Sequence, residues 1–262
     1  MAEIACSFDR ARSTLSFMSA TEDRYRERPG RHPAVAAVWS SAAAATGAAV
    51  VAADGCFDLI VRTTNQGSIA AFVYTPVALA HHVTVEAGDR HVGVRLRPGF
   101  GPVLVGRPAL VRAAEGLGVD RADELEALVV NAVEEHARPP NIVADFVEEA
   151  RASAGALRLT GHSSASRERE LQRACRKWLG LSPKAFLRIE RGSAARDAIR
   201  TGAALATIAA DLGYADQAHL TREVRELLGV TPRELRRVGN LQDLATLSGY
   251  SIENEPSPME SA

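Results

Sequence analysis

The sequence predicts an α+β protein: a small antiparallel β-barrel or sandwich-like domain, a helical connector and an all-α C-terminal domain with two helix-turn-helix units. Three observations predict this class. Short apolar runs separated by polar breaks fill residues 34–97, amphipathic helical periodicity begins after Pro108, and a pattern of helix, glycine stop and Ser/Thr-Pro restart occurs twice between residues 170 and 235. The predicted units are an N-terminal arm at 1–30, a β-rich domain at 31–113, a helical connector at 118–154, the all-α domain at 155–240 and a disordered tail at 241–262.

The arm carries no strong strand signal, whereas the β-rich domain contains a series of short apolar runs. The Asp54-Gly55 pair fits a tight turn between two of them. Residues 41–53 are rich in alanine and fit either a strand or a helix. The predicted strands are AVAAVWSS, GAAVVAA, FDLIVRT, SIAAFVY, HHVTVEA and HVGVRLR.

Two amphipathic helices are predicted in the connector. Asp120 is the expected N-cap of the first, and Pro139-Pro140 ends it. A second helix begins near Ile142. These helices either simply pack on the β-rich domain or, as the family resemblance given below implies, connect the domains and support a homodimer.

The stretch from Ala204 to Arg237 contains every part of a helix-turn-helix unit. Its first helix stops at Gly213, and Asp216 caps a second helix that ends at Gly229. A Thr-Pro-Arg-Glu sequence then opens a third helix. Small, polar and cationic side chains on the solvent face of the second helix suit a DNA major groove. The predicted inward residues are Leu220, Val224, Leu227 and Leu228, and the outward ones are Gln217, Ala218, Thr221, Arg222 and Arg225.

Residues 170–186 repeat the pattern of residues 219–235. The alignment pairs Gly180 with Gly229 and Arg173 with Arg222, and a hairpin duplicated only for packing is the alternative. A helix capped by Ser182 is predicted to run to Arg200 and to join the two units. Its length of about 27 Å is close to the roughly 34 Å between successive major-groove segments. The outward stripe of the first unit consists of Arg169, Gln172, Arg173 and Arg176.

Two such units in one small domain, the second reading LGYADQAHLTREVRELLGVTPRELRR, resemble the DNA-binding domain of the AraC/XylS family of bacterial transcription regulators. The segments DGCFDLIV and VGVRLRPGFGPVLVGRP are similar to a regulatory domain found in front of some such DNA-binding domains. The resemblance implies a sequence-specific regulator, an activator as in most of that family, with double-stranded DNA and RNA polymerase as partners. It also implies that residues of both outward stripes face base edges or phosphates.

The first unit departs from the family pattern. Its scaffold helix reads ALRLTGHSSAS, with Gly161 inside, where the family has an apolar and Ala-rich helix. Glu168 and Glu170 lie beside the outward stripe, where they either read cytosine or weaken phosphate binding. An alternative function is therefore a protein-interaction module whose first unit does not touch DNA.

Charge is divided unequally along the chain. The whole chain has 31 Lys+Arg and 32 Asp+Glu, a net charge of −1. Residues 151–240 contain 17 basic and 9 acidic residues, or +8, which leaves 14 basic and 23 acidic residues, or −9, for the remainder. A basic domain beside an acidic one predicts nucleic-acid binding by the former. Without a signal peptide or an apolar run of 18 residues, the chain is expected to be cytoplasmic and nucleoid-associated, with no membrane partner.

Two arginines are candidates for binding a small-molecule effector. Arg95 and Arg97 alternate with apolar residues in the last predicted strand, so both guanidinium groups are expected on one face. They could clamp an anionic effector, together with Asp58. Pairing of the arginines with structural carboxylates such as Asp58 is the favoured alternative.

We expect no metal site, no cofactor and no catalytic site in this chain. His81, His82 and His91 could serve a cupin-like metal enzyme with a DNA tether, which is the alternative function in the enzyme class. Adjacent histidines point to opposite faces of a strand, however, and no catalytic constellation can be assembled. Cys6, Cys56 and Cys175 are unclustered, which argues against a disulfide framework or a zinc site.

Overall fold

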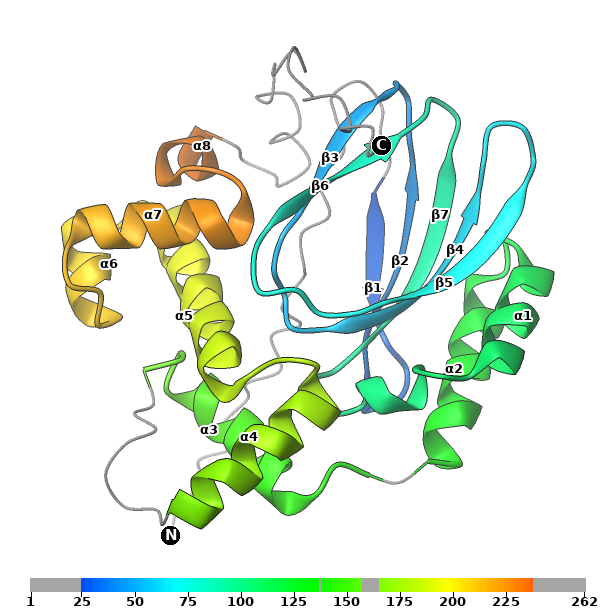
Figure 1. The fold of residues 1–262 in the computed structure, drawn as a ribbon. Helices are drawn as coiled ribbons and strands as arrows, with labels where there is room; N and C mark the ends of the chain where they lie inside the picture. The colour runs from blue at the N-terminus through cyan, green and yellow to red at the C-terminus, as the bar shows by residue number, and fades with distance from the viewer. Residues whose placement is uncertain (1–24, 137, 157–164, 238–262) are drawn as a thin grey trace, which may run out of the picture.

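The computed structural model of the chain describes residues 25–136, 138–156 and 165–237. Figure 1 shows a β-rich domain beside a group of helices that follows it in the sequence. Most of the predicted arm, the segment 157–164 of the first unit and the predicted tail lie outside the described residues.

All strand pairs among the described residues are antiparallel, as predicted. Five strands form one sheet in the order β1-β2-β7-β4-β5, and β3 pairs with β6 in a second sheet. The two sheets do not close into a barrel. All six predicted strands are confirmed as β2 to β7. The strands are β1 Arg26–Pro29, β2 Val35–Ala42, β3 Gly47–Val51, β4 Phe57–Thr63, β5 Ile69–Tyr74, β6 His81–Val85 and β7 Arg90–Leu96.

The structure corrects one prediction for this region and decides between the two alternatives of another. Arg26–Pro29 was expected in the arm, but it pairs with β2 as an edge strand, with Arg28 opposite Val38. The segment RERP contains no apolar run that would signal a strand, because an edge strand can carry charged residues and proline. The alanine-rich segment is extended rather than helical, since it contains the end of β2 and the whole of β3.

Two helices cover one face of the five-stranded sheet: α1, Pro108–Leu117, and α2, Ala122–Glu134, which follow the short 3-10 helix η1, Gly101–Val103. Leu59, Val94, Leu110 and Val129 share the core between the sheet and these helices. The expected N-cap at Asp120 is wrong. Arg121 occupies the N-cap position of α2 without a side-chain hydrogen bond, while the Asp120 carboxylate pairs with Arg90.

The remaining helices build a second core. Val143, Phe146 and Ala150 of α3 pack there with Phe186, so α3 and α2 belong to different cores. No helix among the described residues is both long and apolar enough to cross a membrane. The helices are α3 Asn141–Ala152, α4 Ala165–Leu179, α5 Pro183–Arg200, α6 Leu205–Asp211, α7 Gln217–Leu228 and α8 Pro232–Arg237.

The β-rich domain is bonded to the C-terminal end of α7. The Ala53 amide donates to the Leu227 carbonyl and the Ala80 amide to the Glu226 carbonyl, each at 2.8 Å. Val50 and Ala53 are also buried in the second core. Because the last carbonyls of a helix have no partner inside the helix, these two amides supply partners for two of them in α7. The second core therefore includes residues of both domains.

Both repeated glycine stops touch the β-rich domain. A Cβ added at Gly229 would lie 2.4 Å from Cγ1 of Val50, and one added at Gly180 would lie 3.0 Å from Cζ of Phe57. These glycines are the equivalent positions of the internal repeat. The ends of α4 and α7 thus rest on the same domain, which holds them at a set distance from each other.

The contact at Gly229 predicts a stability difference between two glycine substitutions. Gly229 (φ +73°) and Gly213 (φ +70°) both adopt the left-handed conformation, which costs a residue with a Cβ about 1–2 kcal/mol. At Gly213 no atom of the described residues lies within 4 Å of an added Cβ. We expect Gly229→Ala to lower the free energy of unfolding by about 1–3 kcal/mol more than Gly213→Ala does, because only the former overpacks the domain junction. Urea unfolding of both variants checks this, and equal losses would contradict the close contact.

Candidate nucleic-acid interface

The second helix-turn-helix unit forms as predicted. Oδ1 of Asp216 accepts a hydrogen bond from the His219 amide at 2.6 Å, which caps α7, and Gly229 ends the helix in the left-handed conformation. Thr231 and Glu234 form a reciprocal capping box, with the Thr231 amide 2.6 Å from Oε2 of Glu234. Local caps therefore define both ends of α7 and the start of α8.

The outward residues of α7 form what we call the second stripe. Four members are exposed, whereas Thr221 is half-buried and its hydroxyl donates to the Gln217 carbonyl at 2.9 Å. The opposite side of α7 is buried, with Leu220 and Val224 at 0% exposure. The second stripe consists of Gln217, Ala218, Thr221, Arg222 and Arg225.

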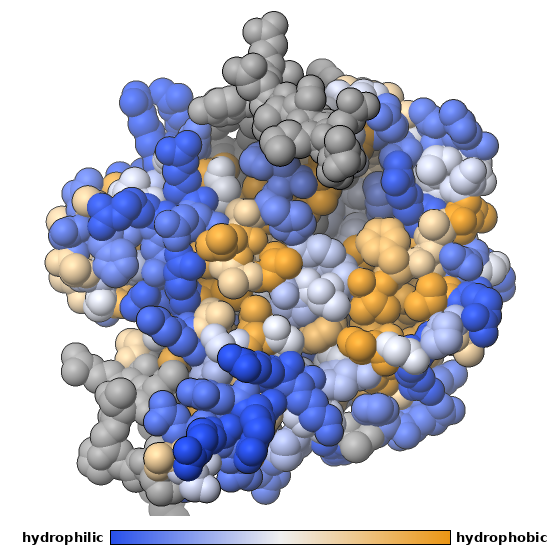
Figure 2. All heavy atoms as spheres, viewed as in Figure 1, coloured by the Kyte–Doolittle hydropathy of each residue, from blue (hydrophilic) through white to orange (hydrophobic). Residues whose placement is uncertain are grey.

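The outward residues of α4 form the first stripe. All four are exposed, while Cys175, Trp178 and Leu179 on the other side are buried in the second core. Cys175 is therefore a core residue, as predicted. Figure 2 shows hydrophilic side chains gathered over α4 and α7. The first stripe consists of Arg169, Gln172, Arg173 and Arg176.

The helix between the units has the predicted bounds. Oγ of Ser182 accepts from the Ala185 amide at 3.2 Å and caps α5, which continues over 18 residues to Arg200. At about 1.5 Å per residue this is about 27 Å. This length is close to the roughly 34 Å between successive major-groove segments on one side of DNA.

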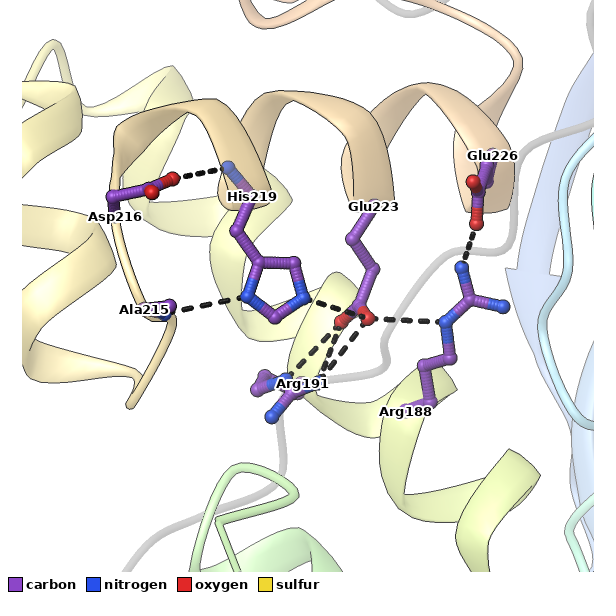
Figure 3. Close-up of polar contacts among 7 residues, drawn as sticks. All are labelled: Arg188, Arg191, Ala215, Asp216, His219, Glu223 and Glu226. Carbon is purple, nitrogen blue, oxygen red and sulfur yellow. Dashed lines mark hydrogen bonds and ion pairs between the residues drawn. The ribbon is translucent and has the colours of Figure 1, made fainter.

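The sequence-based reading missed a group of buried charges behind the second stripe. Glu223 is 5% exposed and is paired with Arg188 and Arg191 of α5 (Figure 3). A signal for it existed: Glu223 lies among the inward residues of α7, three positions after Leu220. A carboxylate at such a position requires cationic partners from a neighbouring helix.

The two candidate arginines of the β-rich domain are in different environments. Arg95 is buried, and its guanidinium lies 3.3 Å from Asp54 and 3.3 Å from Asp58, with Glu27 at 3.7 Å. Trp39 Nε1 also donates to Asp58, at 2.6 Å. Arg97 follows the end of β7 and is half-buried. Arg95 and Asp58 thus stand together in a structural ion cluster, and Arg97 is not brought to it.

The three histidines do not converge. His81 stacks on Tyr74 with ring centroids 5.8 Å apart, and the adjacent His82 is exposed on β6. His91 lies in the other sheet, opposite Ser41, and burial lowers its pKa. Within the described part of the chain, no three His, Cys, Asp or Glu side chains are grouped to hold a metal ion.

The ion cluster predicts a pH effect on stability. Burial raises the pKa of Asp54 to about 6, although Arg95 opposes the shift. A carboxyl that holds its proton more tightly in the folded chain stabilises that chain below pH ~4, and this contribution is lost as the pH rises through about 6. The unfolding free energy of the wild type is expected to fall relative to that of Asp54→Asn across this interval. Asparagine keeps the oxygen that accepts from the Cys56 amide. Urea unfolding at several pH values tests this, and a difference independent of pH would contradict it.

Residues 164–238 match a family model described as a helix-turn-helix domain. No match was found among the curated proteins. Solved structures of ToxT from Vibrio cholerae are similar to this chain. A P21 crystal form is 7% identical, with a TM-score of 0.41, and the match covers 82% of this chain and 99% of that one. ToxT from strain O395 is 10% identical, with a TM-score of 0.37 and coverages of 86% and 99%. The same protein bound to (E)-4-(8-methylnaphthalen-1-yl)but-3-enoic acid is 9% identical, with a TM-score of 0.41 and coverages of 81% and 98%.

The matched range contains α4, α5 and the capped unit of α6 and α7, with both stripes. Residues 164–238 therefore form an AraC-type helix-turn-helix domain, a domain that binds DNA in transcription regulators.

Proposed function

We propose that the chain activates transcription by reading two successive major-groove segments, one with α4 and one with α7. The observation that carries this proposal is the pair of outward stripes on two helices of an internal repeat, joined by the capped helix α5. Activation is proposed, rather than repression, on the resemblance to the AraC/XylS family. RNA polymerase is then the downstream partner.

The two stripes have different proposed roles along their length. Gln217 and Arg222 present amide and guanidinium groups that can pair bidentately with adenine and guanine edges. Arg176 and Arg225 lie in the last turns of α4 and α7, where we assign them to phosphates. The basic charge of residues 151–240, +8, supports phosphate binding by the same domain.

The acidic remainder of the chain is proposed to regulate this activity. Support comes from its bonds to the end of α7, through which a change in the β-rich domain would reach the second stripe. A small-molecule effector or a second copy of the chain could cause such a change. The cluster of Arg95 and Asp58 is assigned a structural role in it, because the guanidinium already has carboxylate partners.

Footprinting tests the reading of two segments. The probe is a duplex selected by the full chain from a random-sequence pool. Two protected segments about one helical turn apart are expected. One protected segment would favour the interaction-module alternative, and failure to select any sequence would contradict specific DNA binding.

Arg222 is predicted to discriminate between bases. Arg222→Ala should weaken binding to the selected duplex by roughly 1–3 kcal/mol and should affect random DNA much less, because a bidentate base contact is lost. Arg112→Ala, which removes an exposed arginine of α1 in the acidic region, is the matched control and should change neither affinity. Equal losses on both DNAs would identify Arg222 as a phosphate contact instead.

Salt dependence is predicted from the charge division. If about five phosphates are neutralised, the logarithm of the binding constant should fall linearly with the logarithm of salt concentration, with a slope of roughly −4 to −5. Titrations of the full chain between low and moderate salt measure the slope. Binding that does not respond to salt would contradict a phosphate-binding role for the basic domain.

A further inference from the structure

Glu223 is a buried carboxylate on the side of α7 opposite the second stripe, close to α5. Its side chain is 6% exposed, and it is in contact with cations on two sides (Figure 3). Nε of Arg188 donates to Oε2 at 3.0 Å, and Arg191 donates to Oε1 from Nε at 3.1 Å and from Nη2 at 2.9 Å. The two guanidinium groups thus approach both oxygens of one carboxylate.

The surroundings of Glu223 restrict α7 further. The Arg191 guanidinium lies 4.7 Å from the ring centre of Tyr214, which is buried at 5% exposure in the turn before α7. The His219 ring packs edge-on against Tyr214, and its Nε2 lies 3.8 Å from Glu223. Its Nδ1 accepts from the Ala215 amide at 3.3 Å. The turn, the first part of α7 and α5 are therefore tied together around one carboxylate.

The geometry leaves α7 little freedom to turn on α5. An added Cβ at Gly192 of α5 would lie 2.5 Å from Cδ1 of Leu227, so the helices are in close contact one turn beyond Arg188. Charge-assisted bonds of a planar guanidinium fork are directional, unlike apolar packing. Rotation of α7 about its axis would move Glu223 away from both arginines and would also turn the second stripe.

We propose that Glu223 is a positioning residue for DNA reading, which sets the angle of the second stripe relative to the first through Arg188 and Arg191 of α5. The proposal rests on the proposed function, in which α4 and α7 meet successive groove segments. Three residues separate α5 from the end of α4, and α5 is capped by Ser182 and packs against α4, so an angle set on α5 is an angle relative to the first unit. Glu223 itself need not touch DNA.

The test measures how strictly the full chain requires one spacing between the two DNA segments. The probes are the selected duplex and versions with one base pair inserted or removed between the protected segments. Each such change moves the second segment by about 3.4 Å and about 34°. The wild type is expected to lose about tenfold in affinity on the altered probes, comparable to a mismatched base pair.

Glu223→Gln keeps the side-chain shape but replaces a carboxylate oxygen by an amide group that cannot accept from a guanidinium. We expect its penalty for altered spacing to shrink to about threefold or less, because α7 can then adjust its angle to the moved segment. Glu226→Gln is the matched control on the same helix. Glu226 is 55% exposed and pairs with Arg188. Its substitution therefore leaves the contact of the Arg191 guanidinium with Glu223 intact. Its penalty should stay close to that of the wild type.

Arg191→Lys provides a second variant, since it keeps the charge and removes the fork. It should also relax the spacing requirement, and it decides the outcome if Glu223→Gln does not fold. Equal affinity losses on all three probes would assign Glu223 a purely structural role, and an unchanged tenfold penalty would also overturn the proposal. A wild-type footprint of one segment would overturn it while leaving DNA binding intact. Failure of the wild type to select DNA would instead refute the proposed function.

Discussion

The hydrogen bonding at the C-terminal end of α7 is the constraint on which the arrangement of the domains depends. A helix leaves its last carbonyls without internal partners, and here the β-rich domain supplies the amides of Ala53 and Ala80. At the other end Asp216 caps the same helix. α7 is therefore held by its own turn at one end and by the β-rich domain at the other. This is a direct physical route from the acidic domain to the second stripe.

Internal pairing determines which charges remain available to DNA. Within the β-rich domain Arg95 is enclosed by carboxylates, and behind α7 Glu223 is paired with Arg188 and Arg191. Buried charges need such partners because desolvation of an unpaired ion is costly. The arginines of the two stripes are exposed on the opposite sides of α4 and α7. The exposed face of each stripe is thus rich in arginine, although the whole chain has a net charge of −1.

The features predicted correctly from the sequence depend on neighbouring residues. Short apolar runs separated by polar breaks identified the strands β2 to β7. Short-range signals such as Ser182 and Gly229 identified the start of α5 and the end of α7. The misassignments have a tertiary cause. Asp120 has the residue type of an N-cap, but Arg90 of β7 takes its carboxylate, and Arg26–Pro29 becomes a strand only because β2 offers an open edge. The site residues of both stripes remain predictions that DNA-binding experiments will test.

The sequence by itself determined the elements, the internal repeat and the outward faces of α4 and α7, because periodicity, caps and glycine stops act within a few residues of the chain. It also indicated that Arg95 would pair with Asp58. Only the tertiary structure decided that both glycine stops rest on the β-rich domain and that Glu223 is paired with arginines of α5. Those contacts join residues 32 to 179 positions apart, such as Arg191 with Glu223 and Val50 with Gly229, and local sequence patterns do not encode the distance between elements.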